Sequence, residues 1–220
     1  MAEKAVVVLS GGQDSTTCLW WAMNRFGRDN VAALTFDYGQ RHRIELDCAS
    51  SVTRLAGVSL TVLPIDTFAA IGGNALTDGA IGVAGDEQGG LPATFVPGRN
   101  LVFLTFAAAW AWSRQIDHIV TGVAQTDYSG YPDCRTETID ALSRAIELGM
   151  ERRFTIHTPL MNLTKKDTVL LARELGALDA MAHTHTCYEG RRPPCGACQA
   201  CVLRARGFAE AGIPDPLVSP

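Results

Sequence analysis

The 220-residue sequence predicts an α/β fold: a doubly wound, mostly parallel sheet with helices on both faces, plus a small C-terminal zinc-binding segment. Three observations predict it. Short apolar runs alternate with longer segments of helical periodicity, as in successive βαβ units. The apolar runs are nearly continuous, which indicates strands that are buried on both faces. Four of the seven cysteines gather near the C-terminus.

The elements follow one another in βαβ order. We expect strands at 5–9, 31–36, 60–65, 117–122 and 154–158, and helices at about 15–26, 42–56, 100–114 and 136–148, with a last helix opening near Thr164. Residues 66–97 are rich in glycine and show no sustained periodicity, so they form either a long loop that closes over a site or a disordered segment. Ligands of parallel sheets bind beyond the carboxyl ends of the strands. The candidate ligand loops therefore follow Leu9, Phe36, Ile65, Gly122 and Thr158.

Composition limits the classes of function. With 47% hydrophobic residues, the chain is long enough for one main domain, which we place at 1–182, with a four-cysteine segment at 183–220 packed on it. A net charge of −4 and short, scattered basic stretches argue against a nucleic-acid partner and favour a small acidic or phosphorylated ligand. No apolar run approaches the ~20 residues of a membrane span. We expect a cytoplasmic protein without a membrane partner, and a homodimer, the commonest oligomer.

The loop after the first strand is the strongest signal of chemistry. It comprises Leu9, Ser10, Gly11, Gly12, Gln13, Asp14, Ser15 and Thr16. Glycines let backbone N–H groups approach an anion, and a following helix N-terminus adds partial positive charge. The loop is neither a Walker A loop nor a dinucleotide fingerprint. The alternative is a plain strand-to-helix turn in which Asp14 or Ser15 caps the helix.

The clustered cysteines are Cys187, Cys195, Cys198 and Cys201, in a C-x7-C-x2-C-x2-C pattern. Four thiolates at this spacing suit a closed, tetrahedral structural zinc site. An iron–sulfur cluster is the main competitor, and redox thiols are a weaker one. Cys18, Cys48 and Cys134 lie far apart in sequence, and we assign them no ligand role.

The five histidines do not form the pattern of a hydrolase active site. His183 and His185 precede Cys187, where a positioning role beside the metal is expected because four cysteines already complete a tetrahedron. His42, His118 and His157 have no serine or cysteine arranged around them as in a catalytic triad.

Three further segments carry candidate binding residues. Arg99 and Asn100 open the apolar helix, where they either meet a ligand anion or merely cap the helix. The loop after the fourth strand could stack on and read the edge of a heterocyclic base through Tyr128, Tyr131, Asp133 and Arg135. Lys165 lies near the start of the last helix, where its charge can neutralise a phosphate.

Together these segments resemble a known family. The Ser10–Ser15 loop matches the SGGxDS loop of the N-type ATP pyrophosphatases, or PP-loop proteins. Further similarity, to the branch of that family that acts in queuosine biosynthesis, is carried by residues 36–42, 95–100, 131–135, 158–160 and the four cysteines, which span the chain from end to end. The SGGxDS loop alone specifies only ATP use, whereas the added segments narrow the match.

The resemblance implies a reaction and its participants. It implies an ATP-dependent carbon–nitrogen ligase that converts 7-carboxy-7-deazaguanine and ammonia into the corresponding nitrile, through an amide and by adenylation. The loop from Leu9 to Thr16 would bind ATP, and Asp14, Ser15 and Lys165 would act in catalysis with Mg²⁺. Arg99, Asp133 and Arg135 would bind the substrate, with Tyr128 or Tyr131 stacking on it.

Two other functions stay open from the sequence. A tRNA-modifying thiolase of the same family would need a catalytic cysteine pair and an RNA-binding surface. A zinc-dependent regulator would bind nucleotide without turning it over.

Overall fold

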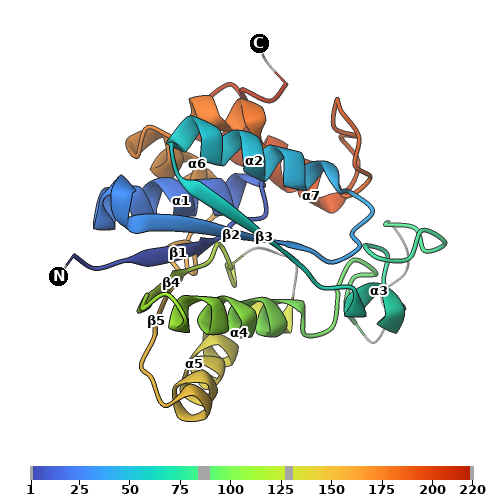
Figure 1. Ribbon diagram of the computed structural model, residues 1–220. Coiled ribbons are helices and arrows are strands. Elements are labelled where there is room, and N and C mark those ends of the chain that lie inside the picture. The colour runs from blue at the N-terminus through green and yellow to red at the C-terminus, as the bar shows by residue number, and fades with distance from the viewer. Residues whose placement is uncertain (1, 84–89, 127–130, 219–220) are drawn as a thin grey trace.

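Five parallel strands form one sheet, in the order β3-β2-β1-β4-β5, in the computed structural model, which describes residues 2–83, 90–126 and 131–218 (Figure 1). The strands are β1 (Ala5–Val8), β2 (Val31–Asp37), β3 (Ser59–Pro64), β4 (His118–Val120) and β5 (Thr155–His157). Chain order runs outward from β1 to β3 and then restarts at β4 on the other side of β1. The predicted doubly wound sheet is confirmed, and its winding direction changes between β1 and β4, where ligands bind in such folds.

Helices cover both faces of the sheet (Figure 1). One face carries α1 (Gln13–Phe26) and α2 (Ile44–Ala56), and the other carries α4 (Arg99–Trp112) and α5 (Thr136–Met150). Side chains of β1 alternate between the two layers: Val7 packs in the α1 and α2 core, whereas Val6 packs in the core that includes Leu104 of α4. Both valines are fully buried, so the continuous apolar run of β1 reflects two covered faces.

A second helix pair completes the layer beside α1. It consists of α6 (Lys165–Glu174) and α7 (Gln199–Ala211), and a short 3₁₀ turn at Asp179–His183 lies between them in the chain. The helices approach closely, since a Cβ on Gly207 would lie 2.9 Å from the Cβ of Lys165. Neither α7 nor this 3₁₀ turn is among the elements predicted from the sequence, because the cysteines dominate the pattern of the C-terminal segment.

A buried ion pair holds the end of the described chain against this layer. The Arg204 guanidinium donates to both carboxylate oxygens of Asp215, at 2.7 and 2.8 Å, and a third N–H donates to the Thr184 hydroxyl at 2.7 Å. Both charged side chains are almost fully buried. Residues 184–215 are therefore tied to one another through α7 rather than appended loosely.

Residues 66–97 are more ordered than a glycine-rich loop suggests. The segment contains the short helix α3 (Thr67–Ile71), and the Asn74 carboxamide oxygen accepts hydrogen bonds from the N–H groups of Leu76 and Thr77. Residues 84–89 of the predicted loop lie outside the described residues. The described part contributes no residue to the cavity that opens at the carboxyl ends of β1, β2 and β4, so closure over that site, one of the two alternatives, is not observed there. Short 3₁₀ turns occur at Arg28–Asn30 and Pro132–Cys134.

None of the helices in the described ranges is long and apolar enough to cross a bilayer.

Candidate active site

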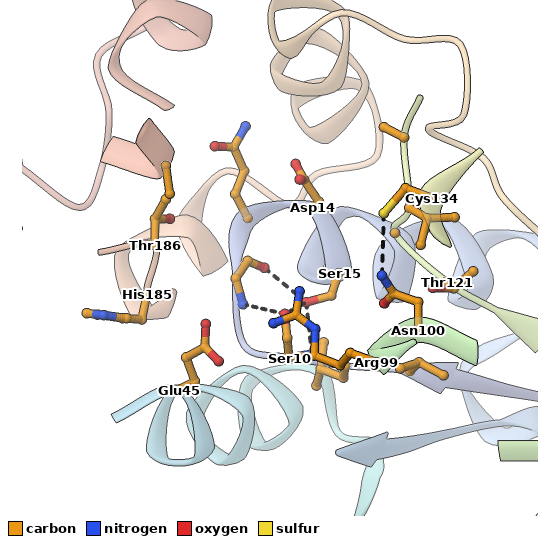
Figure 2. A pocket seen from close by; sticks show the side chains of 18 of the residues that line it. Ser10, Asp14, Ser15, Glu45, Arg99, Asn100, Thr121, Cys134, His185 and Thr186 are labelled. Carbon is orange, nitrogen blue, oxygen red and sulfur yellow. Dashed lines mark hydrogen bonds between the residues drawn. The ribbon is translucent and has the colours of Figure 1, made fainter. Parts of the chain in front are cut away.

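A cavity of about 260 Å³ opens at the carboxyl ends of β1, β2 and β4. Its walls come from the loop after β1, the segment after β2, the start of α4, the start of α6 and the stretch from His185 to Arg204. Figure 2 shows labelled side chains from several of these segments around the loop. The loops predicted after Leu9, Phe36 and Gly122 thus meet at one site. The described part of the loop after Ile65 does not contribute, because β3 is the sheet edge farthest from β4.

The loop from Ser10 to Gly12 is held in a tight turn over the start of α1. The Ser15 hydroxyl accepts a hydrogen bond from the Ser10 N–H at 3.2 Å and donates to the Gly12 carbonyl at 3.2 Å. Gly11 has a φ of +83°, and a Cβ there would lie 2.4 Å from the Glu45 carbonyl oxygen of α2. A side chain at this position would therefore separate the loop from α2.

The start of α1 is not closed by a side chain of the described residues. The N-cap is Gly12 and no side-chain cap is formed, so the alternative of a plain cap by Asp14 or Ser15 is wrong. Backbone N–H groups of an uncapped helix start, together with a glycine turn, suit an anion.

Asp14 and Lys165 meet beside this loop although 151 residues separate them. The Lys165 ammonium donates to Asp14 Oδ2 at 2.6 Å, whereas Asp14 Oδ1 is buried without a partner among the described residues. Thr164 and Asp167 form a capping box that fixes Lys165 as the first residue of α6. Hydrogen bonds from Thr164 lower the pKa of Asp167. The predicted catalytic residues Asp14, Ser15 and Lys165 therefore lie together.

The opposite wall carries a half-buried cation beside phenol side chains. Arg99 of α4 donates to the Tyr38 hydroxyl at 3.1 Å, and the Tyr131 hydroxyl shares a 2.6 Å hydrogen bond with the Thr94 hydroxyl. Burial, partly opposed by Arg99, raises the pKa of Tyr38 to about 12. Burial also raises the pKa of Tyr188 well above its ordinary value. Tyr38 and Tyr188 are therefore neutral hydroxyls at physiological pH and do not neutralise the charge of Arg99.

Not every predicted substrate residue reaches the cavity. Arg99, Asn100 and Tyr131 line it, but Asp133 and Arg135 do not. Asp133 is buried, and its Oδ2 accepts the N–H of Asn100 at 3.0 Å, which stabilises the start of α4. Arg135 is exposed at the start of α5. Tyr128 lies outside the described residues.

The cavity also contains side chains for which the sequence analysis proposed no ligand-binding role. They are Tyr38, Gln40, His42, Glu45, Phe103, His185, Tyr188 and Arg204. Tyr38, Gln40 and His42 follow β2, at the carboxyl edge where ligand loops are expected, so their position alone could have marked them. Glu45 lies one turn further on, inside α2, and carries no such signal.

The four clustered thiols lie close enough to share one ion. All four Sγ atoms are within 4.8 Å of one another, and those of Cys195 and Cys201 are 3.9 Å apart. A tetrahedron with metal–sulfur bonds of about 2.3 Å has edges of about 3.8 Å, which matches zinc. In a four-iron cluster each cysteine binds a different iron, so its sulfurs stand farther apart. A hydrogen bond donated by the backbone N–H of Cys198 lowers the pKa of the Cys195 thiol to about 6.

The structure also shows where the three other cysteines and the two histidines near the cluster lie. Cys18 and Cys48 are buried in α1 and α2, and Cys134 lines the cavity, where its sulfur accepts from the Asn100 amide at 3.4 Å. His185 is buried with Nε2 2.7 Å from the Cys187 carbonyl oxygen, and burial lowers its pKa. His183 is exposed. Tyr188 packs on the cysteine cluster and also lines the cavity, so the cluster supports one cavity wall.

The chain matches the sequence model of a known protein family. The model described as queuosine biosynthesis protein QueC matches residues 4–212. The chain belongs to this family. A relative from Chromobacterium violaceum named 7-cyano-7-deazaguanine synthase is 68% identical, covering 98% of this chain and 93% of the relative. A protein of the same name from Laribacter hongkongensis is 66% identical, covering 99% of this chain and 95% of that protein.

Solved structures of low identity confirm the fold alone. The U34-tRNA thiolase NcsA from Methanococcus maripaludis, solved with its [4Fe-4S] cluster, has a TM-score of 0.52 at 17% identity and covers 97% of this chain and 68% of that chain. A predicted subunit of tRNA methyltransferase from Methanocaldococcus jannaschii has a TM-score of 0.50 at 14% identity, covering 78% of this chain and 75% of that one.

Proposed function

We propose that this chain is an ATP-dependent ligase that converts 7-carboxy-7-deazaguanine and ammonia into 7-cyano-7-deazaguanine in queuosine biosynthesis. Its membership of the QueC family and the names of its relatives support this reaction. The observation that carries the proposal is the cavity, where the glycine loop, which suits an anion, faces a half-buried arginine among aromatic side chains. These are separate places for the phosphates of ATP and for a small acidic heterocycle.

ATP binds at the loop from Leu9 to Thr16. The substrate carboxylate oxygen attacks the α-phosphorus and pyrophosphate leaves, with the Lys165 ammonium neutralising its charge. Ammonia then displaces AMP to give the amide. Adenylation of the amide oxygen and loss of the second AMP, with the remaining N–H protons, leave the nitrile. ATP provides the activation, so no covalent nucleophile of the protein is needed.

Mg²⁺ supplies charge neutralisation on the phosphates when it is bound. The unpartnered oxygen Oδ1 of Asp14 fits this ion, since Mg²⁺ takes carboxylate oxygen ligands beside phosphates.

Arg99 holds the substrate carboxylate, assisted by Asn100, with Tyr131 contributing to the aromatic wall. Tyr128 keeps its proposed stacking role as a prediction. The sequence-based roles of Asp133 and Arg135 also stay predictions, although neither lines the cavity.

The four cysteines hold structural zinc. The spacing of their sulfur atoms supports this assignment. The segment 183–220 then forms a unit packed on the domain 1–182, with α7 against α6. We also propose a cytoplasmic homodimer. Exposed apolar side chains on α4, Phe106 and Trp112, at 44% and 52% exposure, are candidates for its interface.

The test combines the purified zinc-loaded protein with ATP, Mg²⁺, ammonium and 7-carboxy-7-deazaguanine. Mass spectrometry should show the nitrile, and the nucleotide product should be AMP. ATP bound without turnover would favour the regulator, and sulfur transfer to tRNA would favour the thiolase. Absence of nitrile from metal-loaded, folded protein would refute the proposed reaction.

A further inference from the structure

We propose that Glu45, in the first turn of α2, is the carboxylate that recognises the deazaguanine ring. Its two oxygens would accept hydrogen bonds from the ring N–H and from the adjacent exocyclic amino group. This inference rests on the proposed function and assigns the determinant of base specificity within the same site.

Glu45 is held in the cavity wall rather than on the outer surface of α2. Its side chain is 15% exposed, and its Oε2 lies 3.2 Å from Nε2 of His42, whose side chain is 3% exposed. Figure 2 shows the Glu45 carboxylate directed from α2 toward the loop that contains Ser10. The contact of Gly11 with the Glu45 backbone fixes this first turn against the loop.

The other carboxylates near the site are already engaged. Among the described residues that line the cavity, the carboxylates are Asp14 and Glu45. Asp14 forms an ion pair with Lys165 beside the phosphate loop. Asp133, which the sequence suggested for the base, does not line the cavity and accepts a backbone N–H of α4. Glu45 is therefore the carboxylate positioned for the ring.

The charges of the cavity match the two ends of the substrate. The substrate has a carboxylate at one end and, at the other, two neighbouring N–H donors that pair naturally with the two oxygens of a carboxylate. Arg99 lines the cavity from α4 and Glu45 from α2. Tyr38 and Tyr188 lie within electrostatic reach of both charges, so aromatic faces are available along the ring.

His42 acts as a positioning residue in this arrangement. An Nε2–H of His42 that donates to Glu45 Oε2 fixes this oxygen in place. Because the carboxylate is rigid and planar, the same contact also fixes the direction of the second oxygen. The buried Nδ1 of His42 has no partner among the described residues, so the ring is held by packing and by Glu45.

The test compares two substrates in the wild-type protein and in the variant Glu45→Gln. One substrate is 7-carboxy-7-deazaguanine, and the other is its analogue with hydrogen in place of the 2-amino group. We expect Glu45→Gln to lower kcat/KM about 100-fold for the first substrate, chiefly through KM, because the Gln amide opposes one of the two donors. For the analogue we expect a loss of less than about 10-fold, with the KM for ATP unchanged.

Controls separate this role from folding and from the reaction as a whole. Asp47→Asn removes the same charge from the exposed side of the same helix turn and should leave both substrates unaffected. Glu45→Asp keeps the charge with a shorter reach and should show an intermediate loss. Urea unfolding checks that each variant folds.

Two results would overturn the inference while leaving the proposed function intact. Equal losses for both substrates would show that Glu45 does not read the amino group. A raised KM for ammonium alone, relieved at higher pH, would show that Glu45 binds ammonium instead. If the wild-type protein makes no nitrile, the proposed function fails, and calorimetric titration of the two heterocycles into wild type and Glu45→Gln still decides the inference: equal affinities would refute it.

Discussion

Replacing Gly11 by alanine tests how the phosphate loop is built. The φ of +83° at Gly11 costs a residue with a Cβ about 1–2 kcal/mol. The added Cβ would also lie 2.4 Å from the Glu45 oxygen and 2.8 Å from the Ala49 nitrogen, both backbone atoms of α2. Ordinary contact begins near 3.4 Å, so loop and helix must separate by about 1 Å, at an overpacking cost of roughly 1–3 kcal/mol. We expect a total loss of about 2–5 kcal/mol in the free energy of unfolding.

Gly212→Ala is the matched control. Gly212 has a φ of +65°, but nothing lies within 4 Å of a Cβ built there, so only the backbone strain of about 1–2 kcal/mol is expected. Urea unfolding followed by circular dichroism gives both losses, and ATP titration gives the nucleotide affinity. Gly11→Ala should weaken ATP binding and Gly212→Ala should not. Equal losses of stability with unchanged ATP affinity would refute the argument that the loop depends on close contact with α2.

Four further changes have expected outcomes. Asp14→Ala should lower turnover at least about 100-fold with little effect on unfolding by urea, and an unchanged rate would refute its role at the phosphates. Cys198→Ser should lower zinc content and melting temperature together, whereas Cys134→Ser should retain zinc by elemental analysis. Asp215→Ala leaves the buried Arg204 charge without its carboxylate and should destabilise by roughly 3–5 kcal/mol, and a loss below about 1 kcal/mol would contradict the burial of the pair. Burial and the neighbouring His118 lower the pKa of His157, so the unfolded state takes up a proton first as pH falls below about 6.5. Stability should fall over that range, and His157→Phe should make the fall shallower.

The sheet and the turn at Ser10–Ser15 were predictable because their signals are local. Continuous apolar runs such as Ala5–Val8 report burial on two faces, and the predicted strands agree with the observed ones to within a few residues. The Ser10–Ser15 pattern reports a turn whose hydrogen bonds are made within the loop itself. Structure that depends on residues close together in the chain can be predicted from the sequence.

The rest of the site depends on contacts that the sequence does not specify. Asp133 and Glu45 are both carboxylates near ligand loops, and only tertiary packing shows that the first is used by a backbone N–H of α4 while the second lines the cavity. Lys165 was placed correctly at a helix start, but its meeting with Asp14 depends on the packing of α6 against the sheet domain. The amphipathic pattern of α7 was hidden by its cysteines and by Gly207.

The cavity is assembled from residues that the ribosome makes at very different times. The loop at Ser10 and the start of α2 appear early, whereas His185, Tyr188 and Arg204 appear near the end of synthesis. Since chains begin to fold from the N-terminal side while they are made, the nascent protein acquires the glycine loop before it acquires the last wall of the cavity. The cavity is therefore complete only when the stretch from His185 to Arg204 has emerged and folded.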